Sequence, residues 1–168
     1  MNNLDQQYIA GLAERAATGD SNAFAELYAA TFQQQYRFCY AYLQDKFLAR
    51  DALQETYIQA LRNLDSLQDP KLFLPWLNFL CYHCCLEYRL LKTGPTRSPE
   101  DLILLINGRE YTLRQLRLLP FTEAQVLSMR YFDHMPLRRI ARLLRLRTMA
   151  VPRYLARGEK RLREILNP

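Results

Sequence analysis

Three of the four cysteines in this 168-residue chain fall between positions 81 and 85, and thiols are ligands for metal ions as well as reactive groups. Cys81, Cys84 and Cys85 surround a histidine, a combination found in zinc sites. Cys84 and Cys85 are adjacent, however, and no second Cys-x-x-Cys or His-x-x-x-His pair completes a tetrahedral ligand set. On a helix the three cysteines share a face with Trp76 and Leu77. We therefore expect reduced thiols that fill a core, with no metal and no cofactor.

A second group of polar side chains lies on one face of the segment from Ala49 to Leu64, which contains neither glycine nor proline. Asp51, Gln54 and Glu55 recur at helical spacing, and Ile58 and Arg62 continue the same face. A polar helical face is usually only solvated, and the alternative is a surface that docks on a partner protein. The face opposite carries an apolar stripe of Leu53, Tyr57, Leu61 and Leu64.

Positive charge is concentrated in the C-terminal half of the chain. Residues 1–92 contain 8 lysines and arginines against 10 acidic residues, whereas residues 93–168 contain 15 against 7. Arg153, Arg157 and Arg161 recur every four residues and form one basic ridge on a helix, with Arg147 beside it. Such a ridge is often only a solvated surface. Because it lies on the second helix of a helix-turn-helix pattern, which enters the major groove, we expect it to contact DNA phosphates.

Aromatic and basic side chains also occur together on the helix expected at residues 76–91. Phe79, Tyr82, His83 and Arg89 fall off its apolar stripe. Exposed aromatic rings beside basic groups are suited to stacking on unpaired bases. The alternative is that the rings cover a neighbouring helix.

Helices must position all of these groups. Apolar residues recur at helical spacing over residues 4–18, 22–43, 49–64 and 76–91, with Asp20 and Asp69 placed to cap helix starts. Residues 93–110 read as a linker rich in glycine and proline. Within it we expect the run from Leu102 to Ile106 to form a short buried helical turn rather than a strand, because no partner strand is evident.

The C-terminal module follows the linker. Thr112 is expected to cap a short helix, and residues 122–125 fit the capping-box pattern. Pro136 should open the first helix of the helix-turn-helix, and the last helix should run from about Met149 to Leu166. The expected fold is all-α, with two helical domains.

The order and spacing of these segments resemble those of the extracytoplasmic-function sigma factors of bacterial RNA polymerase. Gly19–Tyr28 is similar to the family's opening helix, and Ala49–Tyr57 matches its polymerase-docking signature. Phe73–Leu77 resembles the start of the helix that engages the minus-ten element. Leu119–Arg163 resembles the domain that reads the minus-thirty-five element.

The resemblance implies a helical bundle of the sigma region two type at residues 1–92, the linker at 93–110 with its short apolar helix, and a helix-turn-helix domain of the region four type at 111–168. It implies partners as well: core RNA polymerase, through the beta-prime coiled coil, and promoter DNA, with an anti-sigma factor as a further candidate. The docking residues would be Asp51, Gln54, Glu55, Ile58 and Arg62. The DNA-binding residues would be Phe79, Tyr82, His83, Arg89, Arg147, Thr148, Arg153, Tyr154, Arg157 and Arg161.

The sequence departs from the family mainly where it would face DNA. Tyr82 and His83 replace the usual Arg-Asn pair, and Glu87 replaces an aspartate. Arg145 replaces the usual turn glycine. The segment 150–154 replaces the usual Thr-Val-Lys-Ser-Arg with Ala-Val-Pro-Arg-Tyr.

No catalytic pattern is visible, since the chain has no Gly-rich phosphate loop, no His-Glu-x-x-His and only two histidines. We expect a protein that is not an enzyme. No apolar run approaches the ~20 residues that span a bilayer, and the N-terminus lacks a signal-peptide pattern, so a cytoplasmic location is expected. Two other functions remain open: a helix-turn-helix regulator that acts without polymerase, and a sigma-like interaction module that binds DNA weakly.

Overall fold

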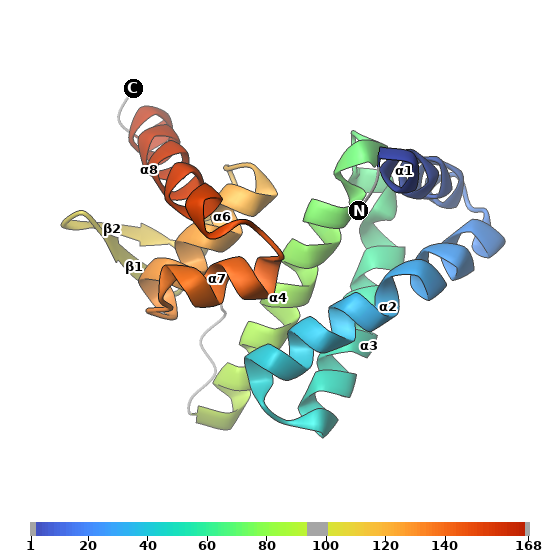
Figure 1. Cartoon of the computed structure of the whole chain (residues 1–168), viewed down its shortest axis with the longest axis horizontal. Coiled ribbons are helices and arrows are strands. Elements are labelled where there is room, and N and C mark those ends of the chain that lie inside the picture. Colours follow the sequence, from blue (N-terminus) through green and yellow to red (C-terminus); the bar gives the residue numbers. More distant parts are fainter. Residues whose placement is uncertain (1–2, 94–100, 167–168) are drawn as a thin grey trace. The chain divides into compact units, whose positions relative to one another are not determined.

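The computed structural model describes residues 3–93 and 101–166 and divides into two compact units, Met1–Tyr88 and Arg89–Pro168 (Figure 1). The first unit is entirely helical over its described residues. Its elements are α1 (Asn3–Ala17), α2 (Ser21–Leu43), α3 (Lys46–Asn63), the 3-10 turns η1 (Leu64–Ser66) and η2 (Pro70–Leu72), and α4 (Phe73–Thr93), whose last residues belong to the second unit.

Aspartate caps set three helix starts in the first unit. Asp20 Oδ1 accepts a hydrogen bond from the Ala23 amide at 3.1 Å, and Asp45 Oδ1 accepts from the Phe47 amide at 2.9 Å. Asp69 caps η2, with Pro70 in the first turn. Each carboxylate satisfies a backbone donor that lacks an intrahelical partner. The predicted caps at Asp20 and Asp69 are confirmed.

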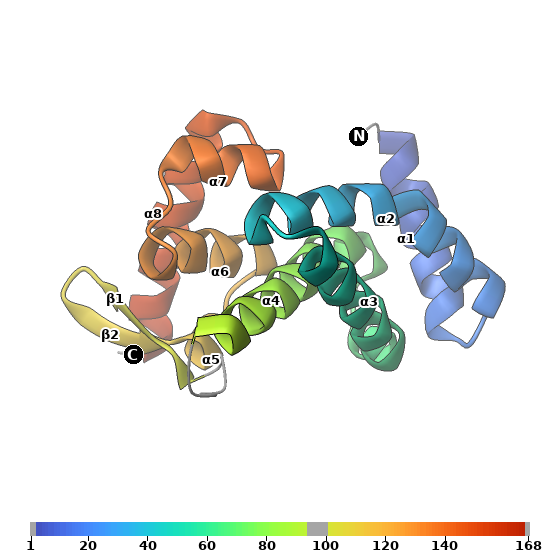
Figure 2. The same cartoon turned by 90° about the horizontal axis from the view of Figure 1, so that it is seen from below.

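Helices α2 and α3 follow one another through a short turn (Figure 2), and small side chains let them pack closely. Ala49, Ala52 and Ala60 of α3 are completely buried, and the Tyr57 hydroxyl lies 2.6 Å from the hydroxyl of Thr31 on α2. The prediction that Leu61 points inward is wrong, because the side chain is 59% exposed. The alanines form the middle of the face that α3 buries against α2. Leu61 lies outside this face, and its side chain therefore points toward solvent.

Beyond the end of α4, the second unit contains a β-hairpin, and the predicted helical turn at residues 102–106 is wrong. β1 (Ile103–Ile106) pairs antiparallel with β2 (Arg109–Thr112), with Ile106 opposite Arg109. The turn residues Asn107 and Gly108 have φ angles of 50° and 78°. Positive φ at both positions gives the turn a twist that matches paired strands, and Asn-Gly adopts it at little cost. The partner strand that the sequence reading missed is β2.

The remaining elements of this unit are short helices. Thr112 caps α5 in a capping box with Gln115, as expected for the cap. The capping box predicted at 122–125 is wrong, because α6 already begins at Phe121, after Pro120. The helices are α5 (Leu113–Leu116), α6 (Phe121–Leu127) with its π-helical continuation η4 (Ser128–Phe132), α7 (Leu137–Leu144), the 3-10 turn η5 (Thr148–Ala150) and α8 (Val151–Leu166).

The all-α prediction is confirmed, with the two-stranded hairpin as its one addition among the described residues. The helix-turn-helix consists of α7 and α8, with Arg145–Arg147 and η5 between them. No helix in the described part of the chain has the length and apolarity needed to cross a membrane.

Candidate functional site

The polar face of α3 lies at the surface, where the sequence placed it. Asp51, Gln54, Ile58 and Arg62 are exposed, and Glu55 is half-buried. Glu55 Oε1 accepts a hydrogen bond from Gln59 Nε2 at 3.1 Å. Within residues 3–93 and 101–166, neither Asp51 nor Glu55 forms an ion pair with a basic side chain. The helix therefore presents two carboxylates whose charge is not neutralised by a cation in the described part of the chain.

The negative charges of Asp51 and Glu55 affect the ionisation of Tyr88 on α4. The pKa of Tyr88 is raised, first by partial burial and then by the negative charges of Asp51 and Glu55. Both effects favour the neutral phenol over the phenolate. The same negative field would favour a cationic partner at this face.

An apolar groove borders the acidic face. It has a volume of about 510 Å³ and lies between α2 and α3. The Tyr28 ring packs edge-on against Tyr57, with centroids 4.6 Å apart. Ile58 and Leu61 keep 37% and 59% of their surfaces exposed. The groove is lined by Phe24, Tyr28, Arg50, Leu53, Gln54, Tyr57, Ile58 and Leu61.

The sequence reading missed Phe24, Tyr28 and Leu61 as members of this surface. Leu61 was placed in the apolar stripe of its helix, and Phe24 and Tyr28 repeat at helical spacing with core residues, so none of the three indicated a surface. The signal that could have found Phe24 and Tyr28 is the width of the apolar face on α2, which is broader than one stripe. Carboxylates beside an open apolar groove form a surface suited to a partner helix with basic and apolar side chains.

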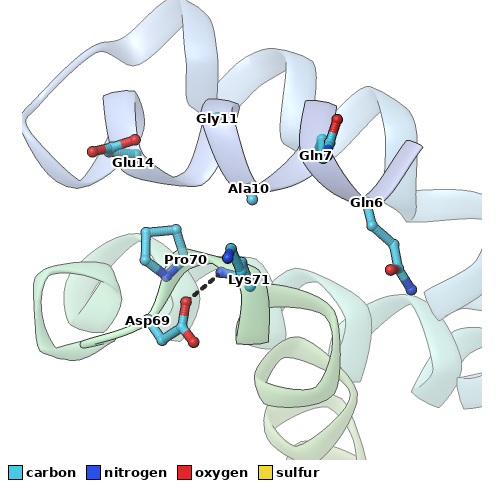
Figure 3. A pocket seen from close by; sticks show the side chains of 8 residues that line it. All are labelled: Gln6, Gln7, Ala10, Gly11, Glu14, Asp69, Pro70 and Lys71. Carbon is cyan, nitrogen blue, oxygen red and sulfur yellow. Dashed lines mark hydrogen bonds between the residues drawn. The ribbon is translucent and has the colours of Figure 1, made fainter. Parts of the chain in front are cut away.

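A second hollow of about 490 Å³ lies between α1 and η2 (Figure 3). Gln6, Gln7 and Glu14 come from α1, and Asp69 and Lys71 lie on the opposite side. The one hydrogen bond drawn there, from the Lys71 amide to Asp69 Oδ1, is the helix cap described above. This hollow shares no residue with the α3 face.

Of the two possibilities for the aromatic residues of α4, the structure shows the second, because the rings are buried instead of exposed. Tyr82 is completely buried and packs edge-on against Tyr42 of α2, with centroids 5.6 Å apart. Phe79 and His83 are also buried, and their rings lie 4.4 Å apart. Helix α4 is covered on more than one side, so a single apolar stripe underestimates its buried surface. Arg89, the first residue of the second unit, is half-buried.

The basic residues of the helix-turn-helix lie where the sequence predicted them. Arg147, Thr148 and Arg153 are exposed at the start of η5 and α8. Pro152 is the second residue of α8, where no intrahelical hydrogen bond is lost. In the described part of the chain, neither Arg147 nor Arg153 forms an ion pair with an acidic side chain. Their guanidinium groups can therefore contact phosphate or base edges without breaking an internal pair.

The other two arginines of the ridge, Arg157 and Arg161, form ion pairs with an acidic residue that the sequence analysis did not identify. Glu123 of α6 is 3% exposed, and its Oε2 lies 3.3 Å from Arg161 Nη1 while its Oε1 lies 3.8 Å from Arg157 Nε. The Arg157 guanidinium also lies 4.9 Å from the centroid of the half-buried Tyr154 ring. These ion pairs of Arg157 and Arg161 with Glu123 therefore connect α8 to α6. A glutamate in an apolar helix, 34 and 38 residues before two arginines, gives no local signal of this contact.

Comparison with known families identifies both units. The Sigma-70 region 2 family matches residues 27–90, and the Sigma-70, region 4 family matches residues 109–162. A Sigma-70 region 2 domain followed by a helix-turn-helix domain of the region 4 kind defines a sigma-70-type transcription initiation factor. The chain belongs to the extracytoplasmic-function sigma factors, which confirms the resemblance seen in the sequence.

Relatives of this group match over most of the chain. It is 24% identical over 171 residues to the ECF RNA polymerase sigma factor SigW of Bacillus subtilis (strain 168), covering 88% of this chain and 91% of SigW. It is 27% identical over 155 residues to the ECF RNA polymerase sigma factor BldN of Streptomyces coelicolor, covering 83% of this chain and 59% of BldN. The solved structure of CnrH in complex with the cytosolic domain of CnrY aligns with a TM-score of 0.49 and 21% identity, covering 95% of this chain and 97% of CnrH.

Proposed function

We propose that the first unit docks on core RNA polymerase through the face of α3 formed by Asp51, Gln54, Glu55, Ile58 and Arg62. The observation that carries this proposal is a pair of carboxylates, Asp51 exposed and Glu55 half-buried, that have no cationic partner among the described residues and lie next to an open apolar groove. Basic side chains of the beta-prime coiled coil would pair with Asp51 and Glu55, and an apolar side chain would enter the groove beside Ile58.

The second unit would then bind the minus-thirty-five element through the start of α8. Arg147, Thr148 and Arg153 are the exposed residues that support this role. In this proposal the protein is a non-enzymatic cytoplasmic factor, and polymerase supplies the chemistry of RNA synthesis. A protein that covers the α3 face, such as an anti-sigma factor, would compete with polymerase for the same carboxylates.

Charge reversal tests the docking surface. The double variant D51K/E55K should bind core polymerase at least tenfold more weakly, because two attractive contacts become repulsive and each exposed pair contributes up to about 1 kcal/mol. The matched control is E14K/D65K, which makes the same change in charge at two exposed acids on α1 and η1. Binding is measured by fluorescence anisotropy with labelled protein, and circular dichroism checks folding.

Run-off transcription from a cognate promoter separates this proposal from its rivals. The D51K/E55K variant should lose promoter-dependent transcripts in proportion to its loss of polymerase binding, while the control keeps them. A regulator that acts without polymerase would show equal polymerase binding for the two folded variants, and that result would overturn the docking assignment.

A further inference from the structure

Three thiols from two helices meet in the core of the first unit. Cys81 and Cys85 are one turn apart on α4, so both side chains project from the same face toward Cys39 of α2. The Sγ atoms of Cys39 and Cys81 are 3.3 Å apart, and the three Sγ atoms all lie within 4.8 Å of one another. All three cysteines have 0% exposure.

The fourth cysteine does not belong to this group. Burial raises the pKa of Cys84 to about 12, and its hydrogen-bond partner is Thr56 of α3. Cys84 thus lies on the α3 side of α4. The chain therefore contains three converging thiols and one equally buried thiol that serves as an internal reference.

We propose that Cys39, Cys81 and Cys85 form a three-sulfur site for a soft cation of the copper(I) class. A metal ion bound to thiolates at about 2.3 Å requires sulfur atoms roughly 3.8–4.0 Å apart, a spacing between the 3.3 Å that separates Cys39 Sγ from Cys81 Sγ and the 4.8 Å within which all three sulfur atoms lie. Small adjustments of the cysteine side chains would equalise the three distances.

The ligand set selects among metals. Thiolates favour copper(I) and zinc over magnesium, calcium and manganese, which prefer oxygen. A closed zinc site needs four ligands, and no fourth histidine, cysteine, aspartate or glutamate joins the group among residues 3–93 and 101–166. Three sulfur ligands without a fourth donor therefore favour copper(I).

Each cysteine that binds the metal loses its proton to solvent. The bound ion would connect α2 to α4, beside the hydrogen bond from Gln35 Nε2 to Asn78 Oδ1 at 2.8 Å.

The test uses the full chain, reduced and free of oxygen, with copper(I) supplied from a competing chelator. The wild-type chain should take up one equivalent and unfold at a higher temperature with copper bound. The control C84S should behave in the same way, whereas C39S and C85S should bind at least tenfold more weakly. X-ray absorption of the wild-type complex should show three sulfur neighbours at about 2.3 Å.

Three results would overturn the proposal. Wild-type protein that takes no copper(I) from the chelator has no such site. Equal copper binding by folded C84S and folded C39S would mean that Cys39 is not a ligand. Mass spectrometry of untreated protein could show the loss of two hydrogens that marks a Cys39–Cys81 disulfide. If such protein also takes up no copper, the cluster is an oxidisable thiol pair and not a metal site. The absorption measurement needs no variant, so an unfolded C39S leaves the test intact.

Discussion

Gly158 of α8 packs directly against Leu127 of α6. A Cβ atom at position 158 would lie 2.8 Å from Leu127 Cδ1 and 3.3 Å from its Cγ, and Leu127 is completely buried. Leu127 therefore has no open space into which its side chain could turn. The absence of a side chain at Gly158 lets α8 approach α6 closely enough for Arg161 to reach Glu123.

Replacement of Gly158 by alanine should destabilise the second unit. Overpacking a core contact costs about 1–3 kcal/mol, and the better helix propensity of alanine returns up to about 1 kcal/mol. We expect a net loss of about 1 kcal/mol in urea unfolding followed by circular dichroism. The control is Gly11→Ala in α1, where nothing lies within 4 Å of the added Cβ and the same exchange should stabilise. Equal shifts at the two sites would contradict the packing argument.

Arg145 ends α7 in the left-handed conformation, with φ 54° and ψ 38°, at the position where the resemblance described above implies a turn glycine. This conformation costs a residue with a side chain about 1–2 kcal/mol. Arg145→Gly should therefore stabilise the second unit by about 0.5–1 kcal/mol, since the flexibility of glycine in the unfolded chain offsets part of the gain. Thermal unfolding measures the change. Arg145→Ala removes the same charge and keeps the strain, so it should bring no gain.

Sequence periodicity was sufficient to locate the α3 face, because a helix packed on one side separates polar from apolar residues. Asp51, Gln54 and Ile58 lie at the surface as predicted. The same reasoning placed Arg147 and Arg153 at the start of the last helix, where Pro152 restricts the possible helix boundary. The roles of these residues in binding remain predictions.

Periodicity did not predict contacts between residues that are far apart in the sequence. Cys39 and Cys81 are 42 residues apart, and nothing near either residue indicates that their sulfur atoms meet. The hairpin was missed although Asn107 and Gly108 form its turn signal, because only Ile103–Ile106 was considered as a strand. The sequence placed Tyr82 outside the core because only one apolar stripe was expected on its helix. In the structure α4 is buried on more than one face, and Tyr82 lies on one of them.

Tyr82 should act mainly as a packing residue. Its ring is completely buried against Tyr42, so Tyr82→Ala should cost about 3–5 kcal/mol in urea unfolding, whereas Tyr82→Phe keeps the ring and should cost much less. With polymerase bound, Tyr82→Phe should give unchanged permanganate footprints of the promoter bubble. A Tyr82→Ala variant of normal stability that fails to melt DNA would instead support stacking on a base.

The basic ridge should divide into two functional pairs. Arg147 and Arg153 are exposed without an internal acidic partner in the described residues, whereas Arg157 and Arg161 are paired with the buried Glu123. We expect Arg153→Ala to weaken promoter binding by about 1–3 kcal/mol and to relax preference at one minus-thirty-five position. Arg147→Ala should weaken binding to all sequences alike and reduce the salt slope by about one.

These effects are measured with the polymerase holoenzyme on promoter variants over a range of salt concentrations. Arg163→Ala, ten residues beyond Arg153 on α8 and therefore about 15 Å along the helix, removes the same charge away from the groove-entering end and serves as the control. Arg161→Ala should lower the stability of the second unit more than the salt slope, because it leaves the Glu123 carboxylate buried with a weaker partner. If Arg147→Ala and Arg153→Ala both match the control in affinity and salt slope, the start of α8 is a solvated face and DNA is bound elsewhere.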